Sequence, residues 1–112
     1  MNISADAGLF GTQTRTNILL VLSLIGETHA SELGRIMGGN VSNIVKAVNS
    51  LEQTGVIASV MAGRTRRVKL NPRYPYRGEL IPLLEKMALS SPGILKAVSD
   101  LRRRPRRSGK EV

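Results

Sequence analysis

The 112-residue chain has no cysteine, no tryptophan, one histidine, two tyrosines and one phenylalanine. Without cysteine there is no disulfide, no thiolate metal ligand, no cysteine nucleophile and no thiol redox sensor. A lone histidine, His29, lacks the partner ligands that a zinc site needs. We therefore expect no metal and no cofactor, and we favour a structural role for His29 near a helix terminus. Because no nucleophile and base form a pair, we also expect that the protein is not an enzyme.

Long hydrophobic runs are missing as well. The longest apolar stretch covers residues 18–25, whereas a helix needs about 20 apolar residues to cross a bilayer. The first ten residues contain no basic side chain, unlike a secretory signal. We therefore expect a soluble, cytoplasmic and nucleoid-associated protein with no membrane partner. This length predicts one domain, at about 100–200 residues per domain.

Acidic residues are absent from one part of the chain, and basic residues gather there. The whole chain has 17 Lys and Arg against 8 Asp and Glu, a net charge of +9. Residues 63–77 hold six basic side chains and no acid, residues 101–112 hold six and one acid, and the remainder sums to −2. Solvated surfaces usually mix both signs, so two unmixed blocks indicate an anionic partner, most often nucleic acid or an acidic membrane face.

Five segments repeat apolar residues every three or four positions, which predicts five helices. We expect them over residues 13–25, 30–37, 41–54, from about 79 to at least 87, and 92–101. Capping and stop signals for the first three are Thr12, Gly26, Gly38-Gly39, Asn40 and Gly55. Between the third and fourth helices, residues 56–61 and 66–70 alternate as two strands around a turn at 63–65, which predicts a β-hairpin with an arginine-rich tip.

The chain is therefore predicted to be mostly α with a small β-hairpin. We divide it into a flexible leader (1–11), a folded domain (12–101) and a basic disordered tail (102–112). The tail is compatible with an inert solubilising end, with a localisation signal and with an arm that follows DNA phosphates, and composition favours neither an inert role nor DNA contact. Its candidate contact residues are Arg102, Arg103, Arg104, Arg106 and Arg107.

Two helices have more apolar surface than a small domain is expected to cover. The 13–25 helix is apolar nearly all round, so it is either central or shares its second face with another subunit. The 92–101 helix is amphipathic and has no obvious further partner. We therefore predict a homodimer, with dimerisation residues Leu20, Val21, Leu24, Ile94, Leu95, Val98 and Leu101.

Three helices followed by a two-stranded hairpin is the element order of a winged helix-turn-helix with additional C-terminal helices. Several segments resemble the small ArsR-type winged-helix regulators of bacteria and archaea over about residues 9–89. They are Leu9-Phe10-Gly11 with Thr14-Arg15, Ser31-Glu32-Leu33, residues 51–57 (LEQTGVI) and residues 70–75 (LNPRYP). The metal sensors of that family use Cys and His ligands, so the resemblance here implies a type that does not sense metals. A second departure is Pro82, which sits where such chains usually continue an uninterrupted helix.

The resemblance implies that the third helix enters the DNA major groove, where its N-terminal part reaches base edges. The predicted base-reading residues are Val41, Ser42, Asn43, Lys46 and Ala47. It also implies that the hairpin, or wing, grips phosphates or a minor groove, a role that the charge distribution independently favours. The predicted wing residues are Arg64, Thr65, Arg66, Arg67 and Lys69.

We therefore expect a sequence-specific double-stranded DNA-binding protein that acts as a homodimeric prokaryotic transcription regulator. One alternative is an architectural, nucleoid-type binder whose affinity is nearly all phosphate neutralisation. Another is a winged-helix protein-interaction module whose arginines meet an acidic partner.

Overall fold

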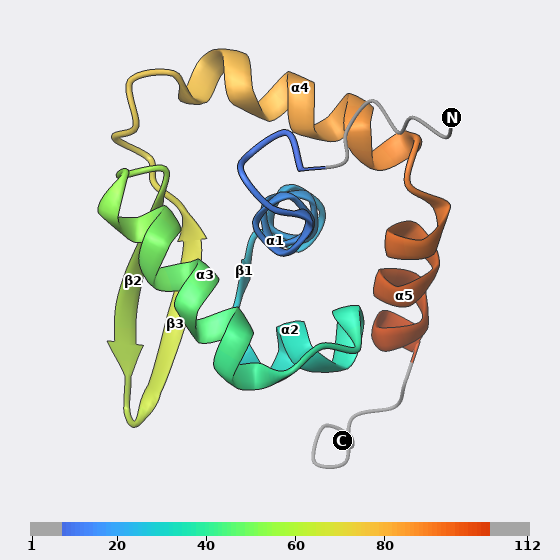
Figure 1. The fold of residues 1–112 in the computed structure, drawn as a ribbon, viewed down its shortest axis with the longest axis horizontal. Coiled ribbons are helices and arrows are strands. Elements are labelled where there is room, and N and C mark those ends of the chain that lie inside the picture. Colours follow the sequence, from blue (N-terminus) through green and yellow to red (C-terminus); the bar gives the residue numbers. More distant parts are fainter. Residues whose placement is uncertain (1–7, 104–112) are drawn as a thin grey trace.

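The computed structural model describes residues 8–103 and has five helices and a three-stranded antiparallel sheet in that part of the chain (Figure 1). The predicted helix-rich fold with a small hairpin is therefore confirmed. The elements in chain order are α1 (Gln13–Ile25), β1 (Glu27–Thr28), α2 (Ala30–Met37), α3 (Val41–Gln53), β2 (Ile57–Ala62), β3 (Thr65–Leu70), α4 (Arg77–Leu89) and α5 (Pro92–Arg103).

Helix α1 is the centre of the fold. Figure 1 shows it end-on, with the other helices and the sheet arranged around it. Residues 18–22 are at most 1% exposed, because α1 packs against α2, α3, α4, α5 and β3. The apolar side chains all round this helix are thus explained by its enclosure within one chain.

Three of the seven predicted dimerisation residues are buried inside the monomer. Leu20 and Val21 are 1% and 0% exposed and Val98 is buried, while the remaining four are half-buried. Helix α5 packs against α1, α2 and α4 of its own chain. The structure therefore corrects the expectation for Leu20, Val21 and Val98, while the four half-buried side chains stay predicted dimerisation residues. A separate subunit could contact Leu20 or Val21 only if the core opened.

Helices α2 and α3 meet through a short turn whose residues match their backbone roles. Gly38 ends α2 in the left-handed region (φ 70°), and its N–H donates to the Gly34 carbonyl at 2.8 Å. Asn40 caps α3, as predicted, because its Oδ1 accepts from the N–H of Ser42 at 2.7 Å. A Cβ on Gly34 would lie 3.3 Å from a methyl carbon of Val41, so glycine permits the close approach of the two helices.

The sheet has one strand that the sequence analysis missed. Its order is β1-β3-β2, with Glu27 opposite Lys69 and Ile57 opposite Leu70. The predicted hairpin is β2 and β3. Asn71 ties the end of this hairpin to the end of α3, since its Nδ2 donates to the Gly55 carbonyl at 2.8 Å.

The boundaries of the C-terminal helices differ slightly from expectation. Helix α4 begins at Arg77 and continues through Pro82 to Leu89, so the proline does not end it. Helix α5 begins at Pro92, as predicted, and extends to Arg103, so the tail predicted to start at residue 102 is helical in its first two residues. The other tail candidates, Arg104, Arg106 and Arg107, lie outside the described residues.

The described end of the leader, residues 8–11, is a turn attached to α1. The Gly11 N–H donates to the Gly8 carbonyl at 2.9 Å, and the Phe10 N–H donates to Thr16 Oγ1 at 3.3 Å. Phe10 also packs against the core. The folded domain therefore starts earlier than the predicted residue 12.

Candidate nucleic-acid interface

Helix α3 has a buried apolar face and an exposed polar face. Its buried residues, Ile44, Ala47, Val48 and Leu51, face the core. Four exposed polar residues repeat at spacings of four, three and four, which places them on one face of a helix. We call this set the α3 polar stripe, and it consists of Ser42, Lys46, Asn49 and Gln53.

Four of the five predicted base-reading residues are exposed. Val41 is 45% exposed, and Ser42, Asn43 and Lys46 are exposed as well. Ala47 is only 8% exposed and belongs to the core cluster, so it is removed from the set.

Asn49 and Gln53 were missed because the sequence analysis considered only the N-terminal part of this helix. The helical spacing from Ser42 and Lys46 was the signal that could have found them.

One arginine of the hairpin binds side chains of α3. Arg66 forms an ion pair with Glu52, donates through Nη1 to Asn49 Oδ1 at 2.8 Å, and donates through Nε to Ser59 Oγ at 3.3 Å. Ser59 in turn donates to Glu52 Oε2 at 2.7 Å. These four residues, which we call the Arg66 network, connect two strands of the hairpin to the C-terminal half of α3.

The Arg66 network also changes the titration of its carboxylate. The Ser59 hydroxyl, which donates to Glu52, and then the adjacent Arg66 guanidinium hold the pKa of Glu52 below its usual range, and partial burial opposes them. The Glu52 side chain is 39% exposed and that of Arg66 is 32% exposed. Solvent therefore screens the pair, and its contribution is that of a surface network.

The other predicted wing residues have different surroundings. Arg67 Nε lies 3.5 Å from Glu27 Oε1 of β1, and Lys69 is half-buried. Thr65 and Arg64 are exposed, and Arg64 makes no hydrogen bond or ion pair within residues 8–103. Two arginines of the basic segment 63–77 are thus paired with carboxylates from distant parts of the sequence. Arg64 is the wing arginine that remains available to an external anion.

The remaining cations of that segment lie elsewhere. Figure 1 shows the turn between β2 and β3 at one end of the hairpin and the connection to α4 at the other. Arg73 and Arg77 belong to that connection and to the start of α4. A six-residue strand spans roughly 17 to 20 Å, so these two arginines are separated from Arg64 by the length of β3.

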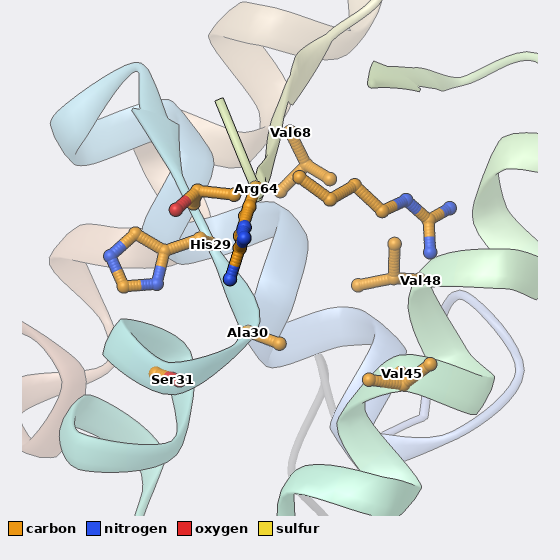
Figure 2. A pocket seen from close by; sticks show the side chains of 9 residues that line it. His29, Ala30, Ser31, Val45, Val48, Arg64 and Val68 are labelled. Carbon is orange, nitrogen blue, oxygen red and sulfur yellow. The ribbon is translucent and has the colours of Figure 1, made fainter. Parts of the chain in front are cut away.

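A cleft of about 350 Å³ lies between the hairpin, the start of α2 and the middle of α3. Figure 2 shows Arg64 at this cleft, between His29 and Val48. Three valines supply its apolar lining (Val45, Val48 and Val68), and Ser31, Thr65 and Arg66 contribute polar groups. The hairpin cation, the helix pair and the cleft are therefore parts of one surface.

His29 and the tyrosines have structural surroundings. His29 caps α2, because its Nδ1 accepts from the N–H of Glu32 at 3.3 Å, in line with the structural role we favoured. Tyr74 packs against the core and meets Tyr76 edge-on, with ring centroids 5.6 Å apart. Within residues 8–103, no group of three or more His, Cys, Asp or Glu side chains could hold a metal ion.

Comparisons of the chain with protein-family models, with curated proteins and with solved structures give no match. In the described part of the chain no helix combines the length and the apolar character that crossing a membrane requires.

Proposed function

We propose that the protein is a winged helix-turn-helix, sequence-specific double-stranded DNA-binding regulator without enzymatic activity. The observation that carries the proposal is the exposed α3 polar stripe, on a helix that also lines a cleft with the open hairpin cation Arg64. In this assignment α2 and α3 form the helix-turn-helix, and β2 and β3 form the wing.

The proposed mechanism assigns different tasks to the two elements. A helix fits the major groove, where exposed polar side chains meet base edges. Lys46 and Ser42 are exposed on α3 and make base or phosphate contacts. Arg64 neutralises a phosphate beside the groove or enters the adjacent minor groove. Regulation follows when the occupied site overlaps a promoter, and DNA binding would place the protein at the nucleoid.

The internal pairing of two wing arginines favours specific recognition over a purely architectural role. Affinity from phosphate neutralisation grows with the number of free cations that reach phosphates. Because Arg66 and Arg67 already face carboxylates, the hairpin has fewer cations for this purpose than its sequence suggests. Selectivity then has to come from the exposed side chains of α3, which include Ser42, Asn43 and Lys46.

The decisive experiment is selection of binding sites from a random DNA library in 150 mM salt, followed by a salt titration on the enriched site. We expect an enriched motif that binds at least tenfold more tightly than random DNA. Equal affinity for both, together with a steep salt dependence, would show an architectural binder instead.

Two lysine substitutions that remove the same charge test the location of the interface. Lys46→Ala removes a cation from the α3 polar stripe, whereas Lys86→Ala removes an exposed cation from α4. Lys46→Ala should weaken DNA binding clearly and Lys86→Ala should leave it nearly unchanged. If neither substitution affects DNA binding, the α3 polar stripe is not the interface. If the wild-type chain binds no DNA, the protein-interaction module becomes the better assignment.

A homodimer on a two-fold symmetric site remains part of the proposal, although Leu20, Val21 and Val98, which we first assigned to its interface, are buried inside one chain. Half-sites about 10 to 16 base pairs apart would accommodate it. Sedimentation of the protein on the selected DNA measures the stoichiometry. Two chains per site are expected, and one chain per site would remove the dimer without affecting DNA recognition.

A further inference from the structure

Arg66 fixes which way the amide of Asn49 points. A guanidinium group has five N–H donors and no acceptor, so the Asn49 atom 2.8 Å from Arg66 Nη1 must be the oxygen. The guanidinium is held on its other sides by Glu52 and Ser59. The donor-only guanidinium of Arg66 therefore sets the orientation of the Asn49 amide.

In this orientation, Asn49 has only its amide N–H donors free to bind another molecule. Its Nδ2 makes no hydrogen bond within residues 8–103, and the side chain is exposed in the α3 polar stripe between Lys46 and Gln53. One lone pair of Oδ1 is occupied by Arg66, and the second lies beside a positive charge. A DNA group that donates a hydrogen bond would have to approach this charge, whereas an acceptor would be attracted.

This asymmetry bears on which base Asn49 can read. A free asparagine in the major groove typically reads adenine, because its oxygen accepts from N6 while its amide N–H donates to N7. Guanine presents two acceptors, N7 and O6, on the same edge. An asparagine whose oxygen already faces a guanidinium is suited to guanine and poorly suited to the amino groups of adenine and cytosine.

We infer that Asn49 is a specificity-determining residue that donates its amide N–H groups to guanine, and that Arg66 is its positioning residue. The inference rests on the proposed function, since it concerns the same DNA-reading surface. It assigns Arg66 a task different from phosphate contact, although both involve DNA.

The test is the same site selection performed with the wild-type chain and four variants. Asn49→Ala removes the amide from the C-terminal half of α3. Asn43→Ala removes an asparagine near the start of α3 that we also assign to base reading, so it tests whether the effect belongs to Asn49 alone. The double variant R66M/E52Q removes the ion pair without changing the net charge. The fourth variant, R66K, keeps a cation that only donates.

We expect the wild-type motif to contain a guanine that Asn49→Ala no longer selects, with about tenfold less discrimination at that position. R66M/E52Q should admit adenine at the same position, because the amide is free to turn, and R66K should keep the guanine. Asn43→Ala should leave this position unchanged. A loss of folding alone would weaken binding to all sites and would not change the selected base.

Two results would overturn the inference in distinguishable ways. If the wild-type chain selects a motif and both Asn49→Ala and R66M/E52Q select the same motif with equal discrimination, Asn49 is not a base reader while the proposed function stands. If the wild-type chain selects no motif, the proposed function fails and the inference fails with it. Thermal unfolding of each variant is measured in parallel, and Asn49→Ala and R66K keep the test decisive if R66M/E52Q does not fold.

Discussion

The tip and the inner face of the hairpin use the same residue type for different purposes. Arg64 at the turn is exposed and makes no ion pair within residues 8–103, whereas Arg66, two residues later, is held by Glu52, Asn49 and Ser59. Arg66 lies opposite Met61 in the strand register and points toward α3, while Arg64 lies in the turn beyond the strand pairing.

This difference teaches that a block of like charge in a sequence is not necessarily a block of free charge on a surface. We first assigned five hairpin residues, Arg64 to Lys69 without Val68, to the DNA backbone. The structure gives Arg66 and Arg67 carboxylate partners from α3 and β1. Gripping phosphates is therefore proposed for the tip, and fixing the hairpin on α3 is the function of the inner face.

The largest expected effect is at the tip. Arg64→Ala should weaken binding to the selected DNA by about 1.5 to 3 kcal/mol, the usual range for a hydrogen bond to a charged group. The slope of log affinity against log salt should fall by about 1, since one phosphate contact is lost. Fluorescence anisotropy at several salt concentrations measures both quantities. An unchanged slope would mean that the tip does not touch phosphates.

Substitution of Arg66 and Glu52, on the face of the hairpin that meets α3, should reduce stability and leave the salt slope unchanged. The R66M/E52Q variant should lose about 1 kcal/mol of unfolding free energy, because a half-exposed network contributes little more. Its salt slope should equal that of the wild type, since the net charge and the phosphate contacts are unchanged. Urea denaturation and the same anisotropy titration are the measurements. A slope reduced by 1 would assign Arg66 to the DNA backbone after all.

Acid should weaken the Arg66 network. The pKa of Glu52 is lowered in the folded state, so its stabilising contribution is complete above the unfolded value of about 4.3. That contribution is lost as the pH falls through the lower folded pKa. Glu52→Gln should therefore be less stable than the wild type at pH 7 and should approach it near pH 3. Denaturation at both pH values checks this, and a constant difference would contradict it.

The smallest effect is expected at the edge of the sheet. The Arg67–Glu27 pair is 3.5 Å apart, with side chains 34% and 45% exposed, so solvent screens it strongly. Arg67→Gln should change the unfolding free energy by less than about 0.5 kcal/mol. Urea denaturation measures it, and a loss above 1 kcal/mol would show that β1 is held mainly by this pair.

The sequence predicted the helices better than it predicted the sheet. Helices α1 and α2 have the predicted bounds, because Thr12 and Gly38 mark their ends and the apolar spacing fills them. Strand β1 has only two residues, and its pairing with β3 comes from the tertiary fold. No local pattern in Glu27-Thr28 could have indicated it.

For the candidate site, the sequence indicated the elements but not the partners of their side chains. The exposure of Ser42, Asn43 and Lys46 followed from helical periodicity, and so does the burial of Ala47, which we had misplaced. Glu52 lies 14 residues from Arg66, so counting charge along the chain could not reveal that they neutralise each other. Apolar content also could not distinguish enclosure of α1 from a subunit interface.

The enclosure of α1 has a consequence for the order in which the molecule opens. Its backbone amides should exchange with deuterated water only when the whole domain unfolds, because every neighbouring element would have to leave first. The amides at the exposed tip of the hairpin should exchange through local fluctuations instead. The surface proposed to meet DNA can thus adjust its shape on binding while the helix beneath it remains closed.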